Sequence, residues 1–391
     1  MTLPGSHCQK QYFEELNEDI CEISDWSVAK KKEKNITSSV SCQDNFESCG
    51  KIQFTRLSKF YLNDYNKFEK FVSLNTCAYH KQNRILVTGF SNGSIFIHEL
   101  PNITLIHSLS ASEYGIGTIS LNNIGDWIAI GCEYEGQFLV WEWQSETYIL
   151  KQHTHNGVIS SIGYSNDGLF IVTGGKDGKI KIWNVCNGYC VVTFSTHSSS
   201  ISAVKFSNNG KFVISSSLDG TVRAHDMYRY RNFRIFTTPS SVQFSCLAID
   251  STDEFVAAGA QDVFHIYVWS IKLGHLIECL TGHEGPVSSI TFCPTICSSS
   301  LISVSWDKTL RLWNTVETGE DCEIIELMSE ALCVAYKSDG KEIAVATLNG
   351  HIMFFNSVNG SQVHDIDGRN DLGTGTRIND RIITGKKKEI R

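Results

Sequence analysis

The chain has 391 residues, of which 41% are hydrophobic, and a formal net charge of −8. This acidic balance excludes a protein that wraps nucleic acid through overall positive charge, so any such contact has to be local. The hydrophobic content argues against wholesale disorder, and 30 glycines with only 5 prolines favour short strands joined by tight turns. Because neither a signal peptide nor a run of 18 apolar residues occurs, we expect a soluble intracellular protein.

The 14 cysteines are scattered along the chain without the paired spacing of a zinc site. They are predicted to be free thiols in a reducing compartment. No cofactor and no metal is expected from the sequence.

Residues 1–50 differ in composition from the rest and are predicted to form a mostly disordered arm. They contain a lysine run at Lys30–Lys34 and a stretch rich in Ser, Thr and Asn. Within the arm, Phe13–Trp26 has the alternative of a short partner-binding helix. From residue 51 we expect structure, and Phe54–Leu62 is compatible with either an outer strand or a packed helix.

From there to residue 368 the chain is predicted to be one repeating domain. One position, usually aromatic, recurs every 42 to 44 residues, at His98, Trp141, Trp183, His225, Trp269, Trp313 and Phe355. A turn residue precedes it by six or seven, at Asn92, Glu135, Asp177, Asp219, Asp262, Asp307 and Asn349. This period is the length of one four-stranded blade, so the sequence predicts an all-β propeller of seven blades.

The most complete repeat is Gly282–Asn314, which has the Gly-His opening, the Ser-x-Asp turn and the terminal Trp of a WD40 unit. Its polar residues predict a buried hydrogen-bonded tetrad, because buried polar groups need partners. The predicted members are His283, Ser305, Asp307 and Trp313. The equivalent Ser, His and Asp residues recur at the blade period, which indicates a structural role for them and not a catalytic one.

Two further expectations concern the arrangement of the blades. The extra residue before Trp269 predicts a bulge in that blade. A closed ring would need the outer strand of one blade to come from the opposite end of the chain, supplied by either Phe54–Leu62 or Gln362–Ile366.

Arginines alternate with aromatic residues in Arg223–Phe236, the segment most suggestive of a binding site. Arginine pairs with phosphates and both residue types stack on bases, so RNA or an acidic peptide is a candidate ligand. The alternative is an outer strand with its arginines in solvent. The candidate contacts are Arg229, Tyr230, Arg231 and Arg234, together with Lys386, Lys387 and Lys388 in a basic, flexible tail over residues 369–391, for which a merely solvated terminus is the alternative.

Several stretches outside the general repeat pattern carry a more specific resemblance, namely Glu135–Glu146, Asp219–Arg223, Tyr228–Arg234, Gln243–Cys246, Ala258–Asp262, Gly282–Pro286 and Ser305–Thr309. Over about residues 51–375 the chain resembles the periodic tryptophan protein 2 family. The resemblance implies a nucleolar, non-catalytic WD40 scaffold of the UTP-B part of the small-subunit processome, acting on ribosomal RNA with the U-three small nucleolar ribonucleoprotein. Members of that family are longer, which implies a shortened or partial chain here.

Two other classes of function stay open from the sequence. An adaptor for substrate recognition or trafficking would use the same ring to bind proteins without RNA. A hydrolase would require clustered carboxylates or histidines, and no P-loop, Gly-x-Ser-x-Gly or His-Glu-x-x-His motif occurs in the sequence. We therefore predict a protein that is not an enzyme.

Overall fold

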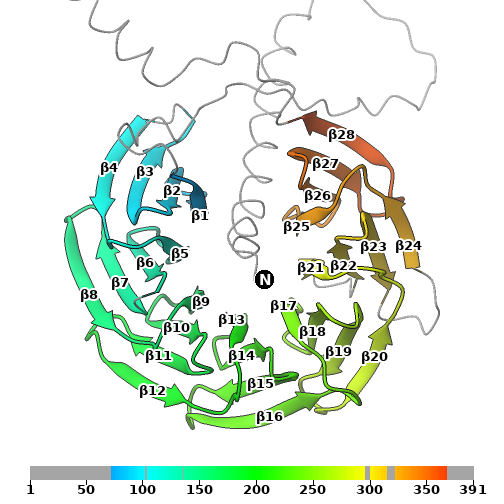
Figure 1. The fold of residues 1–391 in the computed structure, drawn as a ribbon, viewed down its shortest axis with the longest axis horizontal. Helices are drawn as coiled ribbons and strands as arrows, with labels where there is room; N and C mark the ends of the chain where they lie inside the picture. The colour runs from blue at the N-terminus through cyan, green and yellow to red at the C-terminus, as the bar shows by residue number, and fades with distance from the viewer. Residues whose placement is uncertain (1–71, 102–103, 135, 296–299, 315–321, 368–391) are drawn as a thin grey trace, which may run out of the picture.

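The computed structural model describes residues 72–101, 104–134, 136–295, 300–314 and 322–367. In these ranges the chain forms seven antiparallel sheets of four strands each, so the predicted seven-bladed propeller is confirmed (Figure 1). The predicted arm at residues 1–50, the segment Phe54–Leu62 and the tail at 369–391 lie outside the described residues.

Each blade consists of four consecutive strands paired in chain order. Blades 1 to 3 comprise β1 (Leu74–His80), β2 (Ile85–Phe90), β3 (Ser94–Glu99) and β4 (Thr104–Ser110); β5 (Ile116–Leu121), β6 (Trp127–Cys132), β7 (Gln137–Glu142) and β8 (Thr147–His153); and β9 (Ile159–Tyr164), β10 (Phe170–Gly175), β11 (Ile180–Asn184) and β12 (Cys190–Phe194). Blades 4 and 5 comprise β13 (Ile201–Phe206), β14 (Phe212–Ser217), β15 (Thr221–Asp226) and β16 (Arg231–Thr237); and β17 (Phe244–Ile249), β18 (Phe255–Ala260), β19 (Ile266–Ser270) and β20 (Leu276–Leu280). Blades 6 and 7 comprise β21 (Val287–Phe292), β22 (Ser300–Ser305), β23 (Thr309–Asn314) and β24 (Cys322–Glu326); and β25 (Ala331–Tyr336), β26 (Glu342–Thr347), β27 (His351–Asn356) and β28 (Gln362–Asp367).

The second strand of a blade is the most deeply buried, and its sequence reflects this. In β2 and β26 every residue is buried, because both faces of the strand pack against other strands. Such strands read as nearly continuous apolar runs instead of alternating ones. The fourth strands, such as β4 and β12, are the outermost, and most of their residues are exposed or half-buried.

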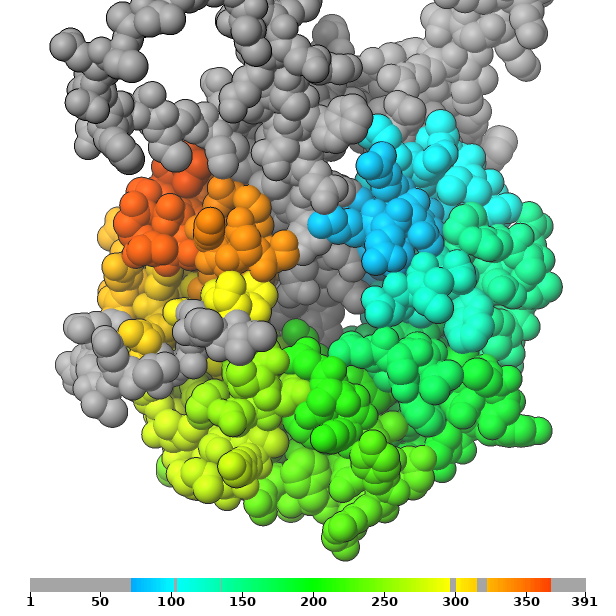
Figure 2. All heavy atoms as spheres, turned by 180° about the vertical axis from the view of Figure 1, so that it is seen from behind, coloured from blue at the N-terminus to red at the C-terminus, as the bar shows by residue number. Residues whose placement is uncertain are grey.

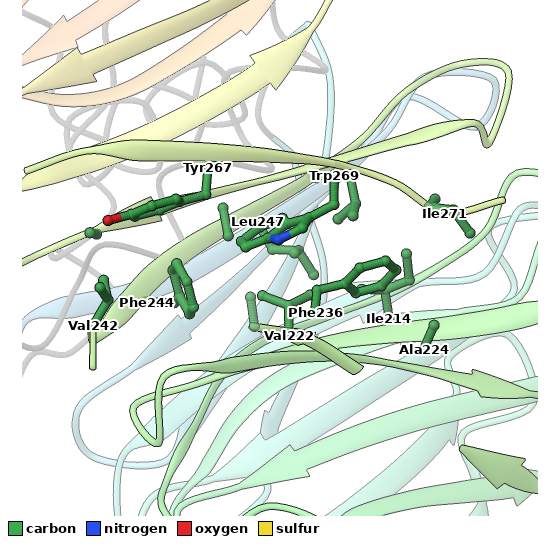
Figure 3. Packing of buried hydrophobic residues seen from close by; sticks show 14 of the residues in the cluster. Ile214, Val222, Ala224, Phe236, Val242, Phe244, Leu247, Tyr267, Trp269 and Ile271 are labelled. Atoms are coloured by element: carbon green, nitrogen blue, oxygen red, sulfur yellow. The ribbon is translucent and has the colours of Figure 1, made fainter. Parts of the chain in front are cut away.

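The recurring aromatic position lies on the third strand of each blade and is buried in all seven. Trp269 on β19 shows the packing best (Figure 3). Its ring stacks on Tyr267, with centroids 5.9 Å apart, and meets Phe244 edge-on at 5.8 Å. Phe236 reaches it from the preceding blade, with a centroid distance of 5.9 Å. These large rings therefore fill the space between neighbouring blades and hold the blades together.

The inner strands β1, β5, β9, β13, β17, β21 and β25 lie side by side in that order around a common centre. Figure 2 shows the same succession of blades from the opposite side. Figure 1 shows an arc that is open between blade 1 and blade 7. The stretch Gln362–Ile366 does not close the ring as one alternative predicted, because β28 pairs with β27 of its own blade.

Blade 5 contains β-bulges, as predicted, between Phe244 and Cys246 and between Val268 and Trp269. Matching register shifts occur in other blades, so they do not come from the extra residue. The pairing of β18 with β19 has no register shift, from Phe255 opposite Ser270 to Gly259 opposite Ile266. The added residue lies in the turn between these strands, where Phe264 has a φ of 62°. A turn can lengthen without disturbing the strand pairing, so the extra residue lies outside these bulges.

Because consecutive strands are antiparallel, the turns of a blade emerge on two opposite faces. One face carries the turns between second and third strands and the connections between blades; we call it the Asp face, after Asp177, Asp219 and Asp307. The other carries the turns between first and second and between third and fourth strands; we call it the Asn face.

Side-chain amides tie the blades together on the Asn face. The Asn123 Nδ2 donates to Asn166 O at 3.4 Å, and the Asn166 Nδ2 donates to Asn208 O at 2.6 Å. The Asn208 Nδ2 in turn donates to Asp250 O at 3.0 Å. Each of these residues lies in the turn that follows the first strand of its blade, so this asparagine ladder connects blades 2, 3, 4 and 5.

Candidate functional site

The polar tetrad of blade 6 is a chain of hydrogen bonds. It connects the segment before β21 to β22, to the turn that follows β22 and to β23. The His283 Nδ1 lies 2.7 Å from the Asp307 Oδ2, and the His283 Nε2 lies 2.8 Å from the Ser303 Oγ. The Trp313 Nε1 donates to the same Ser303 Oγ at 2.8 Å. Because the Ser303 Oγ accepts the indole N–H, its own hydroxyl proton can be directed to the His283 Nε2.

The predicted tetrad was therefore wrong in one member, since Ser303 and not Ser305 completes it. In the strand pairing, Trp313 lies opposite Leu301. Ser303 is two residues further along β22, about 7 Å away, and Ser305 is four residues further, about 13 Å away. Only Ser303 lies within reach of the indole. The Ser305 Oγ instead accepts the Asp307 backbone N–H at 3.1 Å and supports the turn.

Blade 3 has the same complete arrangement, with threonine in place of serine. The His155 Nδ1 lies 3.0 Å from the Asp177 Oδ1, and its Nε2 lies 2.9 Å from the Thr173 Oγ1. The Trp183 Nε1 donates to that oxygen at 3.1 Å. The position in this blade that corresponds to the predicted Ser305 is Gly175, so the pattern based on Ser305 does not identify Thr173.

Blade 4 has the histidine, the carboxylate and the hydroxyl, but not the indole. The His197 Nδ1 lies 2.9 Å from the Asp219 Oδ2, and its Nε2 lies 2.9 Å from the Ser215 Oγ. His225 occupies the Trp position and bonds through its Nε2 to the Thr196 Oγ1 at 3.2 Å.

Burial controls the charge states in these tetrads. Burial lowers the pKa of His155 and of His197, although the neighbouring carboxylates oppose the shift. Burial by itself would raise the pKa of Asp307, but hydrogen bonds from His283 and Thr309 outweigh it and hold this pKa below its usual range. The carboxylates are therefore charged and the histidines of blades 3 and 4 are neutral at physiological pH.

These His, Asp and Ser or Thr residues resemble a hydrolytic triad in composition only. The hydroxyl-bearing residues Thr173, Ser215 and Ser303 are fully buried. In blades 3 and 6 the hydroxyl oxygen also accepts an indole N–H. A nucleophile has to reach its substrate, so this arrangement supports a structural role. In blades 3, 4 and 6 the hydrogen bonds connect the histidine that precedes the first strand to the turn between the second and third strands.

The Tyr–Arg turn, Tyr228–Arg231, projects from the Asn face between β15 and β16. Tyr228 is 78% exposed and Tyr230 is 40% exposed, and both arginines are exposed as well. The Asp226 carboxylate holds the turn, accepting the backbone N–H groups of Tyr228 at 2.7 Å and of Arg229 at 3.1 Å. Tyr230 has a φ of 49°, a backbone conformation that side-chain-bearing residues seldom adopt.

The structure divides the predicted contact residues. Arg234 does not lie in the turn but on β16, where its Nη2 donates to Lys272 O of blade 5 at 3.0 Å. Its side chain lies against Gly274, where a Cβ would approach the Arg234 Cδ to 3.0 Å. Phe233 is half-buried and meets Phe212 with ring centroids 5.9 Å apart. The outer-strand alternative thus describes β16, whereas the turn before it presents two tyrosines and two arginines to solvent.

The remaining predicted contacts, Lys386, Lys387 and Lys388, lie outside the described residues. A cavity of about 400 Å³ lies among the inner strands and is lined mainly by hydroxyl, amide and apolar side chains. Among the described residues that line it, His80 is the one histidine and Lys205 the one lysine. No group of three or more His, Cys, Asp or Glu residues in the described ranges is placed to hold a metal ion. The described part of the chain also has no helix with the length and apolarity needed to cross a bilayer.

Three segments of the chain match a known family of repeats. The family described as "WD domain, G-beta repeat" matches residues 144–184, 188–226 and 274–314. These ranges end at or just after the buried aromatic positions of blades 3, 4 and 6, including Trp183 and Trp313.

Longer relatives match over most of this chain. The chain is 53% identical over 336 residues to the mouse "Periodic tryptophan protein 2 homolog", a match that covers 86% of this chain and 36% of the mouse protein. It is 49% identical over 312 residues to "Periodic tryptophan protein 2" of Saccharomyces cerevisiae, covering 80% of this chain and 34% of the yeast protein. For the Arabidopsis thaliana protein of the same name, the identity is 40% over 308 residues, covering 79% and 34%. The chain thus spans about a third of the length of these relatives, and over the matched residues it belongs to the periodic tryptophan protein 2 family of WD-repeat proteins.

Proposed function

We propose that this chain is a non-catalytic scaffold in ribosome biogenesis, acting in the nucleolus during assembly of the small-subunit processome and processing of small-subunit ribosomal RNA. Its proposed partners are the other UTP-B proteins, pre-ribosomal RNA and the U-three small nucleolar ribonucleoprotein. The family relation supports this proposal. The observation that carries the RNA part of it is the exposed Tyr–Arg turn on the Asn face.

The Tyr–Arg turn has the chemistry of a single-strand RNA contact. The Arg229 and Arg231 side chains are exposed. Both attract the Asp226 carboxylate, but their two positive charges exceed its single negative charge, so the turn keeps a positive charge for pairing with phosphates. The exposed tyrosine rings offer stacking surfaces that are worth about 1–3 kcal/mol per base. The net charge of −8 belongs to the whole chain, so the local positive charge of the turn is what would attract the RNA backbone.

Binding of a fluorescent single-stranded RNA of about twelve nucleotides tests the proposal directly. The double variant Arg229→Ala/Arg231→Ala should weaken binding and flatten the dependence of log K on log salt by about 1.4, since each phosphate contact contributes about 0.7. The matched control is Lys176→Ala/Lys341→Ala, which removes two exposed positive charges from other blades. Equal effects of the two double variants would show that the turn is not the RNA contact.

Arg234 calls for a separate measurement. Because its side chain bonds to Lys272 O across a blade boundary, Arg234→Ala should lower stability as well as any binding. Binding to RNA should therefore be compared at a temperature at which this variant is fully folded. If both the Arg229→Ala/Arg231→Ala variant and the Arg234→Ala variant lower the melting temperature without affecting RNA binding, the segment is architectural.

An adaptor that binds proteins and no RNA remains the second candidate. Crosslinking of the chain to RNA in cells separates the two. Enrichment on pre-ribosomal spacer RNA is expected for the scaffold. A ubiquitin-ligase or coat-protein interactome without RNA crosslinks would support the adaptor instead.

A further inference from the structure

We infer that the Asp face of blades 6 and 7 is a docking site for a partner-protein segment that carries an apolar side chain flanked by lysine or arginine. The site is the Trp306 patch, made of Trp306, Met328 and Leu348. This proposal concerns a different face from the RNA contact and does not depend on it.

The three residues of the Trp306 patch come from three separate segments. Trp306 lies in the turn between β22 and β23, Met328 in the connection from β24 to β25, and Leu348 in the turn between β26 and β27. They are 40%, 70% and 54% exposed, respectively. Tryptophan and methionine are enriched at the centres of protein interfaces, where their burial supplies much of the binding energy.

Backbone hydrogen bonds hold these segments against one another. The Trp306 N–H donates to Pro286 O at 3.2 Å, and the Leu327 N–H donates to Lys308 O at 2.7 Å. The Leu348 N–H donates to Glu330 O at 2.8 Å. The turn of blade 6, the connection and the turn of blade 7 therefore form one continuous platform. A partner that binds there has little protein backbone to order, which favours affinity.

The charges around the Trp306 patch favour a basic partner. The exposed Glu284 is fixed beside the Trp306 turn, because its backbone N–H donates to the Asp307 Oδ2 at 3.1 Å. Glu330 lies at the boundary with blade 7, and its Oε1 is 3.7 Å from the Lys308 Nζ. The positive charges here are Lys308 and Arg311, whose Nη2 donates to Gly282 O at 2.7 Å. Against them stand Glu284, Glu330 and the exposed Glu326, which lies opposite Thr309 at the start of β23, so the rim is net negative. Lysine or arginine beside the apolar anchor would complement this rim, whereas RNA phosphates would be repelled by it.

The position of the patch also separates it from the Tyr–Arg turn. The turns of Trp306 and Leu348 follow second strands, whereas the Tyr–Arg turn follows a third strand, so the two lie on opposite faces of the ring. Both surfaces can be occupied at the same time. The propeller would then hold a basic protein segment on one face while RNA contacts the other.

Selection from phage-displayed random twelve-residue peptides on the immobilised full chain tests the inference. The selected peptides are expected to carry an apolar residue with flanking lysine or arginine. Their affinity should fall about tenfold or more with Trp306→Ala, the size of effect typical of an interface hot spot. Met328→Lys provides a second variant in an exposed connection, in case loss of Trp306 disturbs the turn. Leu273→Ala, an equally apolar and exposed change on the Asn face, is the matched control and should leave the affinity unchanged.

The charge part of the inference has its own readout. Glu284→Lys/Glu330→Lys should weaken the selected peptides and remove the salt dependence of their binding. The inference is overturned if the selected peptides are acidic or if no peptide is selected. It is also overturned if the peptides bind the Trp306 and Met328 variants with the same affinity as the original chain. A loss of binding of the single-stranded RNA in the Trp306 variant would assign this face to nucleic acid and overturn it too.

Discussion

Removing the hydroxyl of Ser303 should destabilise the chain far more than removing that of Ser305, although both residues are fully buried in the same strand. In Ser303→Ala the indole N–H of Trp313 loses its acceptor and the His283 Nε2 loses its donor. Each buried group left without a partner costs about 1–3 kcal/mol, so the free energy of unfolding should fall by about 2–6 kcal/mol.

Ser305→Ala removes one acceptor from the Asp307 backbone N–H at a half-buried turn, where water can take its place. Its expected cost is about 1 kcal/mol. Ser303→Thr is the positive control, because Thr173 fulfils this role in blade 3, and it should stay close to the original stability.

Urea unfolding of the four proteins at 25 °C, with the free energy extrapolated to water and the slopes compared, measures these differences. The hydrogen-bond account of the tetrad would be refuted by a Ser305→Ala cost equal to or larger than that of Ser303→Ala. It would equally be refuted by a threonine variant as unstable as the alanine variant.

Three further changes test other parts of the structure. Trp313→Ala should cost about 3–5 kcal/mol, because it removes a buried aromatic ring, and a melting temperature that does not change would contradict this. Gly93→Ala should cost about 2–4 kcal/mol, because its Cβ would lie 2.0 Å from Ser112 O at a φ of +77°, whereas Gly168→Ala, also at positive φ but in open space, should cost only about 1 kcal/mol. Burial lowers the pKa of His225 to about 3, so the folded chain leaves it neutral while the unfolded chain protonates it below pH 6.5. Stability is therefore lost as the pH falls below 6.5, and between pH 7.5 and 5 His225→Phe should gain about 2 kcal/mol relative to the original chain; a difference that does not depend on pH would disprove this.

The blade architecture could be predicted because it follows from periodicity. Seven buried third-strand residues at a spacing of 42 to 44 mark the repeat even where His98, His225 or Phe355 replaces tryptophan. The tetrad was predicted in its histidine, carboxylate and indole, but its hydroxyl was misplaced by two residues. Ser303 and Ser305 lie on the same side of β22, so alternation alone does not distinguish them. The register of Leu301 against Trp313 does, and it could have been derived from the turn length.

The surface features were harder to predict for a different reason. The exposure of the Tyr–Arg turn depends on where β16 begins, and strand boundaries are the least certain part of a sequence-based assignment. The Trp306 patch joins residues from three segments, so no local sequence pattern predicts it. The asparagine ladder was missed for the same reason: Asn123 and Asn166 are typical turn residues, and nothing in the sequence says that their side chains reach the next blade.

The asparagine ladder has a consequence for how the repeats can diverge. Every rung runs from an amide side chain to a main-chain carbonyl, so only the donor is specified by residue type. Any amino acid can occupy the receiving position, because all of them have that carbonyl. A turn can therefore change its sequence as long as it keeps one asparagine whose side chain reaches the next blade. Neighbouring repeats then stay connected without matching substitutions in both of them.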